Sequence, residues 1–213
     1  MSKKSERKRS RPVTKKSPFE KKEVKYGIFL LVLIIIIAAA AYLLLSGSEE
    51  EAQGNPIAVF DTSMGTFKVE LFEDKTPITA TNFVKLVNDG FYDGMNFYRI
   101  SDDFMIQAGR YFPDGSEQFS PYGNIEFETH EDVTHIDGAI SMASTSPGAG
   151  GSSEFFICDG AQHFLDDNYA AFGVVIEGID VIRDIASQPH DNSNPAGGGV
   201  PNEDIIINSI TIE

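Results

Sequence analysis

The chain has 213 residues, which is enough for one domain of ordinary size with appendages. Its formal net charge of −15 is divided unevenly. Residues 1–26 hold 11 Lys or Arg and 3 Glu (+8), so the remainder holds 6 basic and 29 acidic residues (−23). Phosphate would repel this acidic part, so nucleic acid is not an expected partner of it, and the basic segment is interpreted as a topology determinant on the inner leaflet rather than as a nucleic-acid site. A single cysteine, Cys158, excludes an intramolecular disulfide.

The first predicted element is an uncharged apolar segment. The run YGIFLLVLIIIIAAAAYLLLSG is long enough for a helix to cross a hydrocarbon core of about 30 Å. We interpret residues 27–46 as an uncleaved transmembrane signal anchor, because the run is longer than a signal-peptide core and LLLSGS is a poor cleavage site. A cleaved signal peptide is the alternative. By the positive-inside rule, residues 1–26 then form a basic cytoplasmic tail and the body lies outside the membrane.

Residues 47–55, GSEEEAQGN, are polar and predict a short linker, so residues 56–213 form the folded domain. This domain begins with IAVFDTSMGTFKVELF, where two β-rich runs flank TSMG and predict a hairpin. TPITATNFVKLVNDG then predicts a helix, since Phe83, Leu86 and Val87 recur at helical spacing. MNFYRI and FMIQAG predict two strands joined by the turn SDD.

The second half of the domain continues the pattern of short elements. Residues 110–124 are rich in Gly, Pro, Asp and Ser and predict a long surface loop. GAISMAS, EFFICDG and YAAFGVVIEG predict three more strands, IDVIRDIAS predicts a second short helix, and IIINSITIE predicts a closing strand after the loop HDNSNPAGGGVPNED. Many short strands, two helices and no regular alternation of strand with helix favour an all-β barrel or sandwich.

The order of these blocks resembles the cyclophilin family of peptidyl-prolyl cis–trans isomerases. The resemblance runs from about Ile57 to Glu213 and is carried by FDTSMGTFKVELFEDKTPITATNFVKLVNDGFYDGMNFYRISDDFMIQAG, by GAISMAS, by SSEFFICDGAQHFLDDNYAAFGVVIEGIDVI and by the final strand. Several ordered blocks at compatible spacings are more specific than one short motif. The resemblance implies an all-β, closed eight-stranded antiparallel barrel capped by two helices, and an enzyme that accelerates rotation about X–Pro bonds.

The resemblance also implies which residues act. It assigns the catalytic position to Arg99 in FYRI, although by itself Arg99 reads as a salt-bridged surface arginine. A guanidinium is a donor at any working pH. A donor aimed at the prolyl nitrogen would discourage the resonance behind the rotation barrier of about 18–20 kcal/mol. Gln107 is implied to contact the substrate backbone and to orient the arginine.

The implied substrate groove combines an apolar pocket with exposed backbone. By the resemblance, the proline pocket is lined by Phe104, Met105, Phe156 and Leu165. Periodicity alone would favour ordinary core packing for all four. In the block MAS, Ala143 and Ser144 are implied to pair with the substrate through their backbone groups, which a change of side chain leaves intact.

Three positions depart from the family pattern. Phe164 stands where the family often has a tryptophan that donates to cyclosporin, so weak binding of that inhibitor is expected. Tyr169 replaces a common active-site histidine and still offers a hydroxyl. Glu154 replaces a glutamine beside the pocket, where its carboxylate would either position Arg99 or partly neutralise it. Tyr169 and Glu154 are counted among the predicted substrate contacts.

Two polar stretches resemble metal sites only superficially. HEDVTH places His130 and His135 five residues apart, an unusual spacing for a metal pair, and we interpret it as a solvated loop. DNSNP with GGG offers oxygen ligands without the EF-hand spacing and is also interpreted as a loop. No metal or cofactor is therefore predicted.

Two functions follow from these observations. The first is a single-pass membrane enzyme that isomerises X–Pro bonds of exported or extracytoplasmic proteins. The second is a membrane-tethered module or chaperone that binds proline-containing segments with little turnover, which Glu154 and the acidic surface favour. In both, the expected partners are proline-containing polypeptides and, through residues 27–46, the membrane. The soluble domain is expected to be monomeric.

Overall fold

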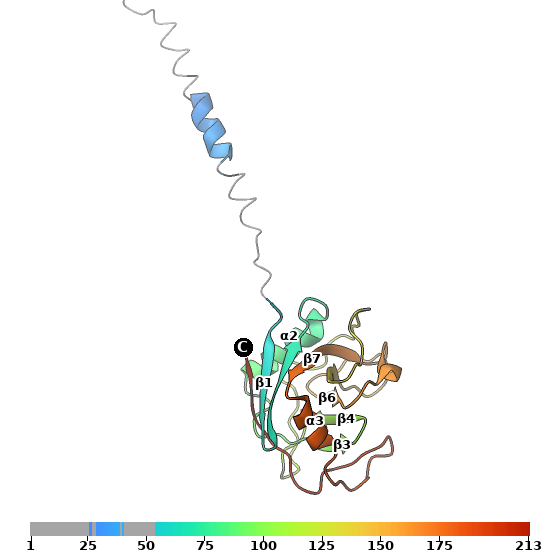
Figure 1. The fold of residues 1–213 in the computed structure, drawn as a ribbon. Helices are drawn as coiled ribbons and strands as arrows, with labels where there is room; N and C mark the ends of the chain where they lie inside the picture. Colours follow the sequence, from blue (N-terminus) through green and yellow to red (C-terminus); the bar gives the residue numbers. More distant parts are fainter. Residues whose placement is uncertain (1–25, 27–28, 39, 41–53) are drawn as a thin grey trace, which may run out of the picture. The chain divides into compact units, whose positions relative to one another are not determined.

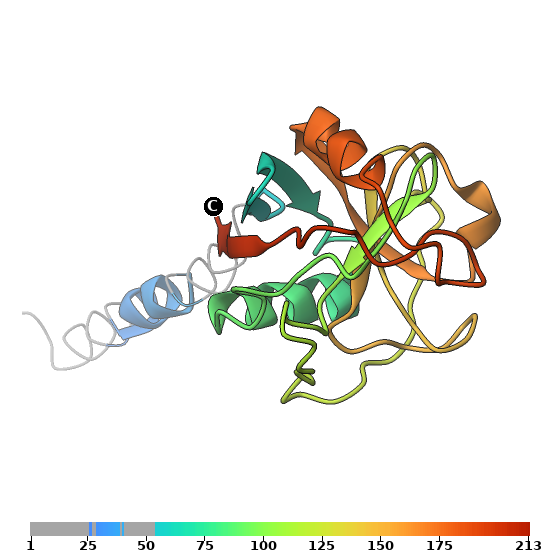
Figure 2. The same cartoon turned by 90° about the horizontal axis from the view of Figure 1, so that it is seen from below.

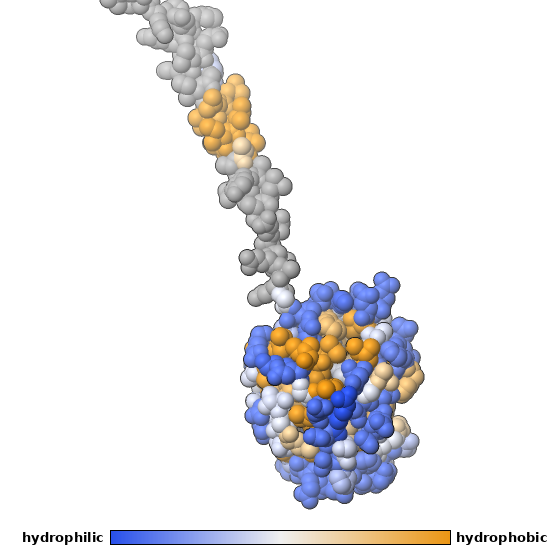
Figure 3. Space-filling model, in the orientation of Figure 1, coloured by the Kyte–Doolittle hydropathy of each residue, from blue (hydrophilic) through white to orange (hydrophobic). Residues whose placement is uncertain are grey.

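The structure, a computed structural model, describes residues 26, 29–38, 40 and 54–213. The chain divides into two units, residues 1–53 and 54–213, which are described separately. In the first unit, residues 29–38 are helical and their apolar side chains are exposed (Figure 3). Within the described ranges, no helix is long and apolar enough to span a membrane. The rest of the predicted anchor, the predicted tail up to residue 25 and linker residues 47–53 lie outside those ranges.

The second unit is built on one antiparallel sheet of eight strands in the order β3-β4-β6-β5-β7-β2-β1-β8 (Figure 1). The strands are β1 Ile57–Thr62, β2 Gly65–Leu71, β3 Arg99–Ser101, β4 Met105–Ala108, β5 Ala139–Met142, β6 Phe155–Cys158, β7 Ala170–Glu177 and β8 Ile207–Ile212. Helix α2 spans Pro77–Asn88, helix α3 spans Ile179–Ala186, and the short 3-10 helix η1 spans His163–Leu165. The eight predicted strands and the two predicted helices are thus confirmed.

The sheet curls into a half-barrel. The prediction of a closed barrel was wrong, because the strand ladders do not form a closed ring. Within residues 54–213, the outer strands β3 and β8 share no ladder. The segments that precede them meet instead at the single bridge between Asn96 and Ile206. The free edge of β3 is taken by a loop residue, because Ile100 pairs with Gly199 of the connection between α3 and β8.

The inner face of the curled sheet carries the main hydrophobic core. Its centre is a group of aromatic rings in which Phe60 stacks on Phe67 at 4.5 Å and Phe83 meets Phe155 edge to face at 5.5 Å. Helix α2 closes this core with Phe83, Leu86 and Val87, the residues whose helical spacing predicted it. Burial of these large side chains is the main source of stability for the domain.

A second, smaller apolar cluster lies on the other face of the sheet. Because side chains alternate along a strand, Ile106 of β4 enters the main core while its neighbour Met105 faces away. The same alternation in β6 separates Phe155 from Phe156. The second cluster contains Met105, Ala139, Phe156, Cys158 and Leu165.

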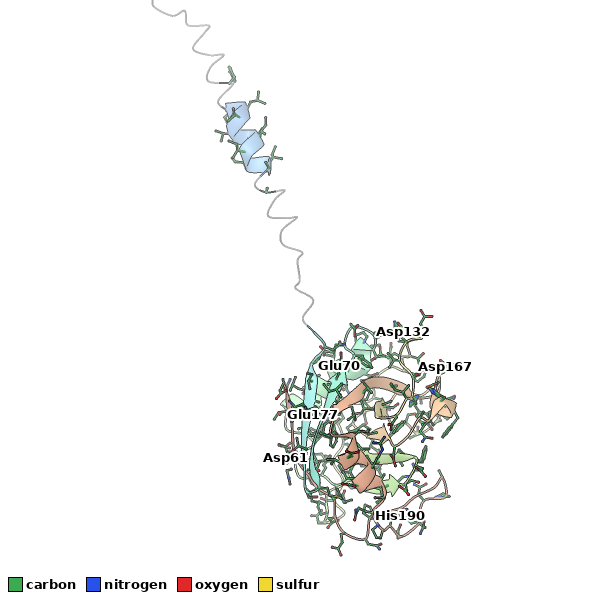
Figure 4. All side chains as sticks on the ribbon, in the orientation of Figure 1. Asp61, Glu70, Asp132, Asp167, Glu177 and His190 are labelled. Carbon is green, nitrogen blue, oxygen red and sulfur yellow. The ribbon has the colours of Figure 1, made fainter. Side chains whose placement is uncertain are left out.

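The surface of this unit is acidic, as its composition requires. Asp61, Asp132, Asp167 and Glu177 are exposed on different elements (Figure 4). The acidic excess is therefore distributed over the surface and stays in contact with water, where carboxylates are best solvated.

Candidate functional site

A cavity of about 430 Å³ opens over the second apolar cluster. It is lined by Arg99, Phe104, Met105, Gln107, Ala143, Ser144, Phe156, Phe164, Leu165, Tyr169 and Ala196. Nine of the ten residues that the sequence predicted for the site therefore share one cavity. The exception is Glu154, which lies in an adjoining cavity of about 220 Å³.

Strand register explains why the polar and apolar groups meet. Arg99 of β3 pairs with Gln107 of β4, Gln107 pairs with Phe156 of β6, and Phe156 pairs with Ser141 of β5. Residues paired in this way lie side by side on the same face of a sheet. One row across four strands thus brings the guanidinium, the amide and the aromatic ring together.

The floor of the cavity is apolar and tightly packed. Met105, Phe156 and Leu165 are almost fully buried in the second cluster. Tyr169 meets the ring of Phe156 edge to face at 5.9 Å. Such a floor excludes water and suits a small apolar group better than a charged one.

Phe164, which departs from the family pattern, forms an open rim of the cavity. Its ring stacks on Phe104 at 5.9 Å and remains 67% exposed. As a phenylalanine it lacks the N–H that a tryptophan would offer there. The rim is therefore an apolar surface that a bound chain can cover.

The guanidinium of Arg99 is held on two sides. Its Nη1 donates to Oε1 of Gln107 at 3.3 Å. Its Nε and Nη2 donate to the carbonyl of Gly197 at 3.1 and 3.0 Å, and Nη2 also donates to the carbonyl of Ala196 at 3.2 Å. Burial lowers the pKa of Arg99, but an arginine stays protonated at any working pH. The site therefore presents a fixed cationic donor.

A chain of side chains supports Gln107 from behind. Nε2 of Gln107 donates to the hydroxyl of Tyr98, and that hydroxyl donates to Glu154. Burial, followed by the nearby carboxylate of Glu154, raises the pKa of Tyr98, so the phenol keeps its proton and remains a donor. Because the amide nitrogen of Gln107 donates to Tyr98, the amide oxygen of Gln107 points toward Arg99.

Glu154 is paired with Arg110, a partner that the sequence did not indicate. The Oε1 atom of Glu154 accepts from Nη1 of Arg110 at 3.1 Å, and Arg110 also pairs with Glu117 at 3.1 Å. Within residues 54–213, Arg99 forms no ion pair with a carboxylate. The charge of Glu154 is thus balanced by Arg110.

His135 lies under the cavity floor, which corrects its interpretation as part of a solvated loop. The side chain is 1% exposed and its ring stacks on Phe156 at 5.8 Å. Nδ1 lies 2.8 Å from Oδ1 of Asp166, and Nε2 lies 3.0 Å from Oγ of Ser141. Although these three residues are arranged like a catalytic triad, Ser141 is fully buried and out of reach of a substrate. The group supports Phe156.

One group of acidic side chains in the described ranges is close enough to share an ion, namely Asp102, Asp103 and Asp159. It lies at the β3–β4 turn, and Asp159 there accepts from the backbone N–H of Asp103 at 3.0 Å. Through this hydrogen bond, Asp159 stabilises the turn. The prediction that the protein needs no metal or cofactor stays a prediction.

Comparison with known proteins finds the same architecture. Residues 57–212 match the family described as cyclophilin type peptidyl-prolyl cis-trans isomerase/CLD. A peptidyl-prolyl cis-trans isomerase of Acinetobacter baylyi is 33% identical over 167 residues, covering 76% of this chain and 88% of the relative. Peptidyl-prolyl cis-trans isomerase A of Dickeya dadantii is 35% identical over 156 residues, covering 71% and 81%.

A solved structure of a cyclophilin-type isomerase from Cryptosporidium parvum is also similar. It was determined in the presence of the dipeptide Ala-Pro, and it aligns with a TM-score of 0.66 at 29% identity. The alignment covers 74% of this chain and 98% of that one.

Proposed function

This chain belongs to the family of cyclophilin-type peptidyl-prolyl cis–trans isomerases and shares its enzyme class, and on that premise we propose how its own residues perform the reaction. The proline ring of a client enters the cavity over Met105, Phe156 and Leu165. Arg99 donates a hydrogen bond to the prolyl nitrogen. The observation that carries the proposal is the position of Arg99, a fixed donor at the edge of an apolar-floored cavity.

The reaction needs neither a nucleophile nor a proton shuttle. The barrier of about 18–20 kcal/mol arises from the partial double-bond character of the C–N bond. In the twisted state the lone pair is localised on the prolyl nitrogen. A donor already aimed at that atom stabilises the twisted state more than the planar one, which is the condition for catalysis.

The other residues hold the substrate while the bond rotates. Gln107 keeps the guanidinium in place and contacts the substrate backbone. The backbone groups of Ala143 and Ser144 pair with the substrate chain along the groove. Phe104, Phe164 and Tyr169 enclose the proline from its open side. The Ala-Pro dipeptide used with the Cryptosporidium parvum relative supports proline-containing peptides as the ligand class.

The proposed mechanism is tested by measuring cis-to-trans exchange of a proline peptide with the full-length chain. Arg99→Ala is expected to lower kcat/KM by at least about 100-fold, the size of effect typical for loss of a preorganised donor. Arg183→Ala is the matched control, because Arg183 of α3 pairs with Asp137 and with Asp180 and does not line the cavity. An Arg99→Ala protein that keeps the wild-type rate would exclude the mechanism.

We further propose that the clients are exported proteins, met outside the cytoplasmic membrane. The motivation is the uncharged run that contains residues 27–46, with its basic flank on one side and its acidic flank on the other. Intact cells that express the chain are treated with a membrane-impermeant amine reagent. Lysines 68, 75 and 85 of the domain should be labelled, while those of residues 1–26 should not. The reverse pattern would contradict this topology.

The alternative function is a binding module with little turnover. The pairing of Glu154 with Arg110 motivates it, because both side chains line the adjoining cavity and would give a bound chain polar contacts that take no part in bond rotation. If Arg99→Ala abolishes exchange but leaves both peptide binding and the cellular phenotype intact, binding is the biological task. A phenotype lost together with the rate favours the enzyme.

A further inference from the structure

The loop between α3 and β8 occupies most of the hydrogen-bonding capacity of Arg99. A guanidinium has five N–H groups. Gly197 accepts from Nε and Nη2, Ala196 accepts from Nη2, and Gln107 accepts from Nη1. If each contact takes its own N–H, four are used and one is left, on Nη1. Three of the four contacts come from the loop, so the loop decides which N–H stays available to a substrate.

The loop is fixed to the strand that carries Arg99. Gly199 and Ile100 exchange two backbone hydrogen bonds of 2.9 and 3.0 Å, and Ile100 follows Arg99 directly. In Figure 2 the dark red connection that leads to β8 crosses the light green strands, in agreement with this pairing. Gly198 has a φ of +76°, and a Cβ there would lie 2.1 Å from the carbonyl oxygen of Ile100. Only glycine permits this approach. The GGG run that resembled a cation loop in the sequence therefore seats the loop against β3.

Asp191 ties the two ends of the loop together. Its Oδ1 accepts from the backbone N–H of Ser193 at 3.0 Å and from that of Val200 at 2.9 Å. Gly199 leaves room for this carboxylate, because a Cβ at Gly199 would lie 2.2 Å from the same oxygen. The loop begins beside His190, which Figure 4 labels. Its two ends thus converge on one carboxylate oxygen.

Asn194 shapes the turn that aims the two carbonyls. Its Oδ1 accepts from the N–H of Ala196 at 2.9 Å, and its own carbonyl accepts from the N–H of Gly197 at 3.0 Å. Side chains of Asp and Asn commonly fix turns by bonding to the backbone two residues on. With both N–H groups engaged inside the turn, the carbonyls of Ala196 and Gly197 face Arg99.

We propose that the loop Asp191–Val200 is a positioning element for the reaction, and that Asp191 and Asn194 are positioning residues that act through Arg99. The inference rests on the proposed function, since it concerns the same guanidinium. Loss of either side chain loosens the two carbonyls and lets the guanidinium turn away from the prolyl nitrogen. Small displacements of a catalytic group lower the chemical rate while leaving substrate binding nearly intact.

The test compares two aspartates that form the same kind of turn. Asp191→Ala in the full-length chain is expected to lower kcat at least about fivefold with KM within about twofold of wild type. Asp191→Asn keeps one acceptor and should restore most of the rate. Asp114→Ala is the matched control, because Oδ1 of Asp114 also accepts from a backbone N–H two residues on, that of Ser116 at 2.9 Å. Asp114 lies in a different loop from Ala196 and Gly197, the backbone partners of Arg99. An unchanged kcat in Asp191→Ala, or an equal loss in Asp114→Ala, would overturn the proposal.

A double-mutant comparison separates positioning from general destabilisation. In an Arg99→Ala background, Asp191→Ala and Asn194→Ala should cause no further loss of rate, whereas a merely structural effect would persist. Hydrogen exchange of the Arg99 Nε–H, followed by NMR, should be faster in both loop variants than in wild type. Equal exchange rates would count against the inference. If Arg99→Ala keeps the wild-type rate, the proposed function is wrong. If Arg99→Ala lowers the rate but the loop variants do not, only the present inference is wrong.

Discussion

The two faces of the β4–β6–β5 region show how one piece of sheet separates stability from function. Phe155 and Phe156 are neighbours in β6, but Phe155 enters the aromatic core and Phe156 lies under the cavity. Both are at most 6% exposed, so burial alone does not distinguish them. What differs is the partner set, which consists of core rings for Phe155 and of His135, Tyr169 and the cavity for Phe156. A change on the inner face should therefore reduce stability, whereas a change on the outer face should mainly reduce the rate.

The strongest test of this contrast is Phe155→Ala. Its ring meets those of Phe60, Phe83 and Tyr92 within 5.8 Å, and all of these are fully buried. The loss of so many contacts is expected to lower the free energy of unfolding by about 3–5 kcal/mol, measured by urea denaturation. Phe155→Leu, a milder change, should keep kcat/KM per folded molecule within about twofold of wild type. A small loss of stability in the alanine variant would mean that the two faces are not energetically distinct.

The reciprocal test is Phe156→Ala. The change removes the aromatic floor of the cavity, and about 2 kcal/mol of apolar contact with proline corresponds to a roughly 30-fold loss of kcat/KM. Its cost in stability should be smaller than that of Phe155→Ala, because one side of the ring already borders the cavity. Isomerisation assays and urea denaturation on the same preparation measure both quantities. A variant that loses more stability than Phe155→Ala would reverse the assignment of the faces.

The sequence predicted the strands from their β-rich runs and helix α2 from the helical spacing of Phe83, Leu86 and Val87, because such patterns depend on neighbouring residues alone. The outer face needed the family resemblance, since nothing in a run such as FMIQAG shows that Met105 borders a cavity. The carbonyls of Ala196 and Gly197 were missed because a backbone acceptor has no side-chain signature. His135 looked solvated within HEDVTH, since the contact that buries it comes from Phe156, which lies 21 positions further along the chain.

Because His135 is buried under the cavity floor, we expect the free energy of unfolding to depend on pH. Burial lowers the pKa of His135, and the hydrogen bond that its Nδ1 donates to Asp166 only partly opposes this. A histidine whose pKa is lower in the folded state contributes stability above its unfolded pKa of about 6.5, and that contribution is lost as the pH falls through the folded value. The free energy of unfolding should therefore decrease below pH 6.5, with a slope of at most about 1.4 kcal/mol per pH unit from this group.

Urea denaturation between pH 7.5 and 5 measures that slope. His135→Gln should flatten it, because the titrating group is gone. His163→Gln is the matched control, since His163 bonds to the other oxygen of Asp166 at 2.9 Å but is exposed. The same slope in wild type and in His135→Gln would show that the buried ring does not set the pH response of the outer face.

The smallest expected effect on kcat/KM is that of Glu154→Gln, in the cavity that adjoins the site. In Glu154→Gln the amide oxygen can still accept from Tyr98, so the orientation of Gln107 is retained. The ion pair with Arg110 is lost, but both of its side chains are partly exposed, and such pairs contribute about 0–1 kcal/mol. Because Arg110 keeps Glu117, we expect kcat/KM within about threefold of wild type, with Glu117→Gln as the control. A tenfold loss confined to Glu154→Gln would mean that the negative charge of Glu154 is needed to position Arg99, and that the hydrogen bond from Tyr98 to a neutral oxygen is not enough.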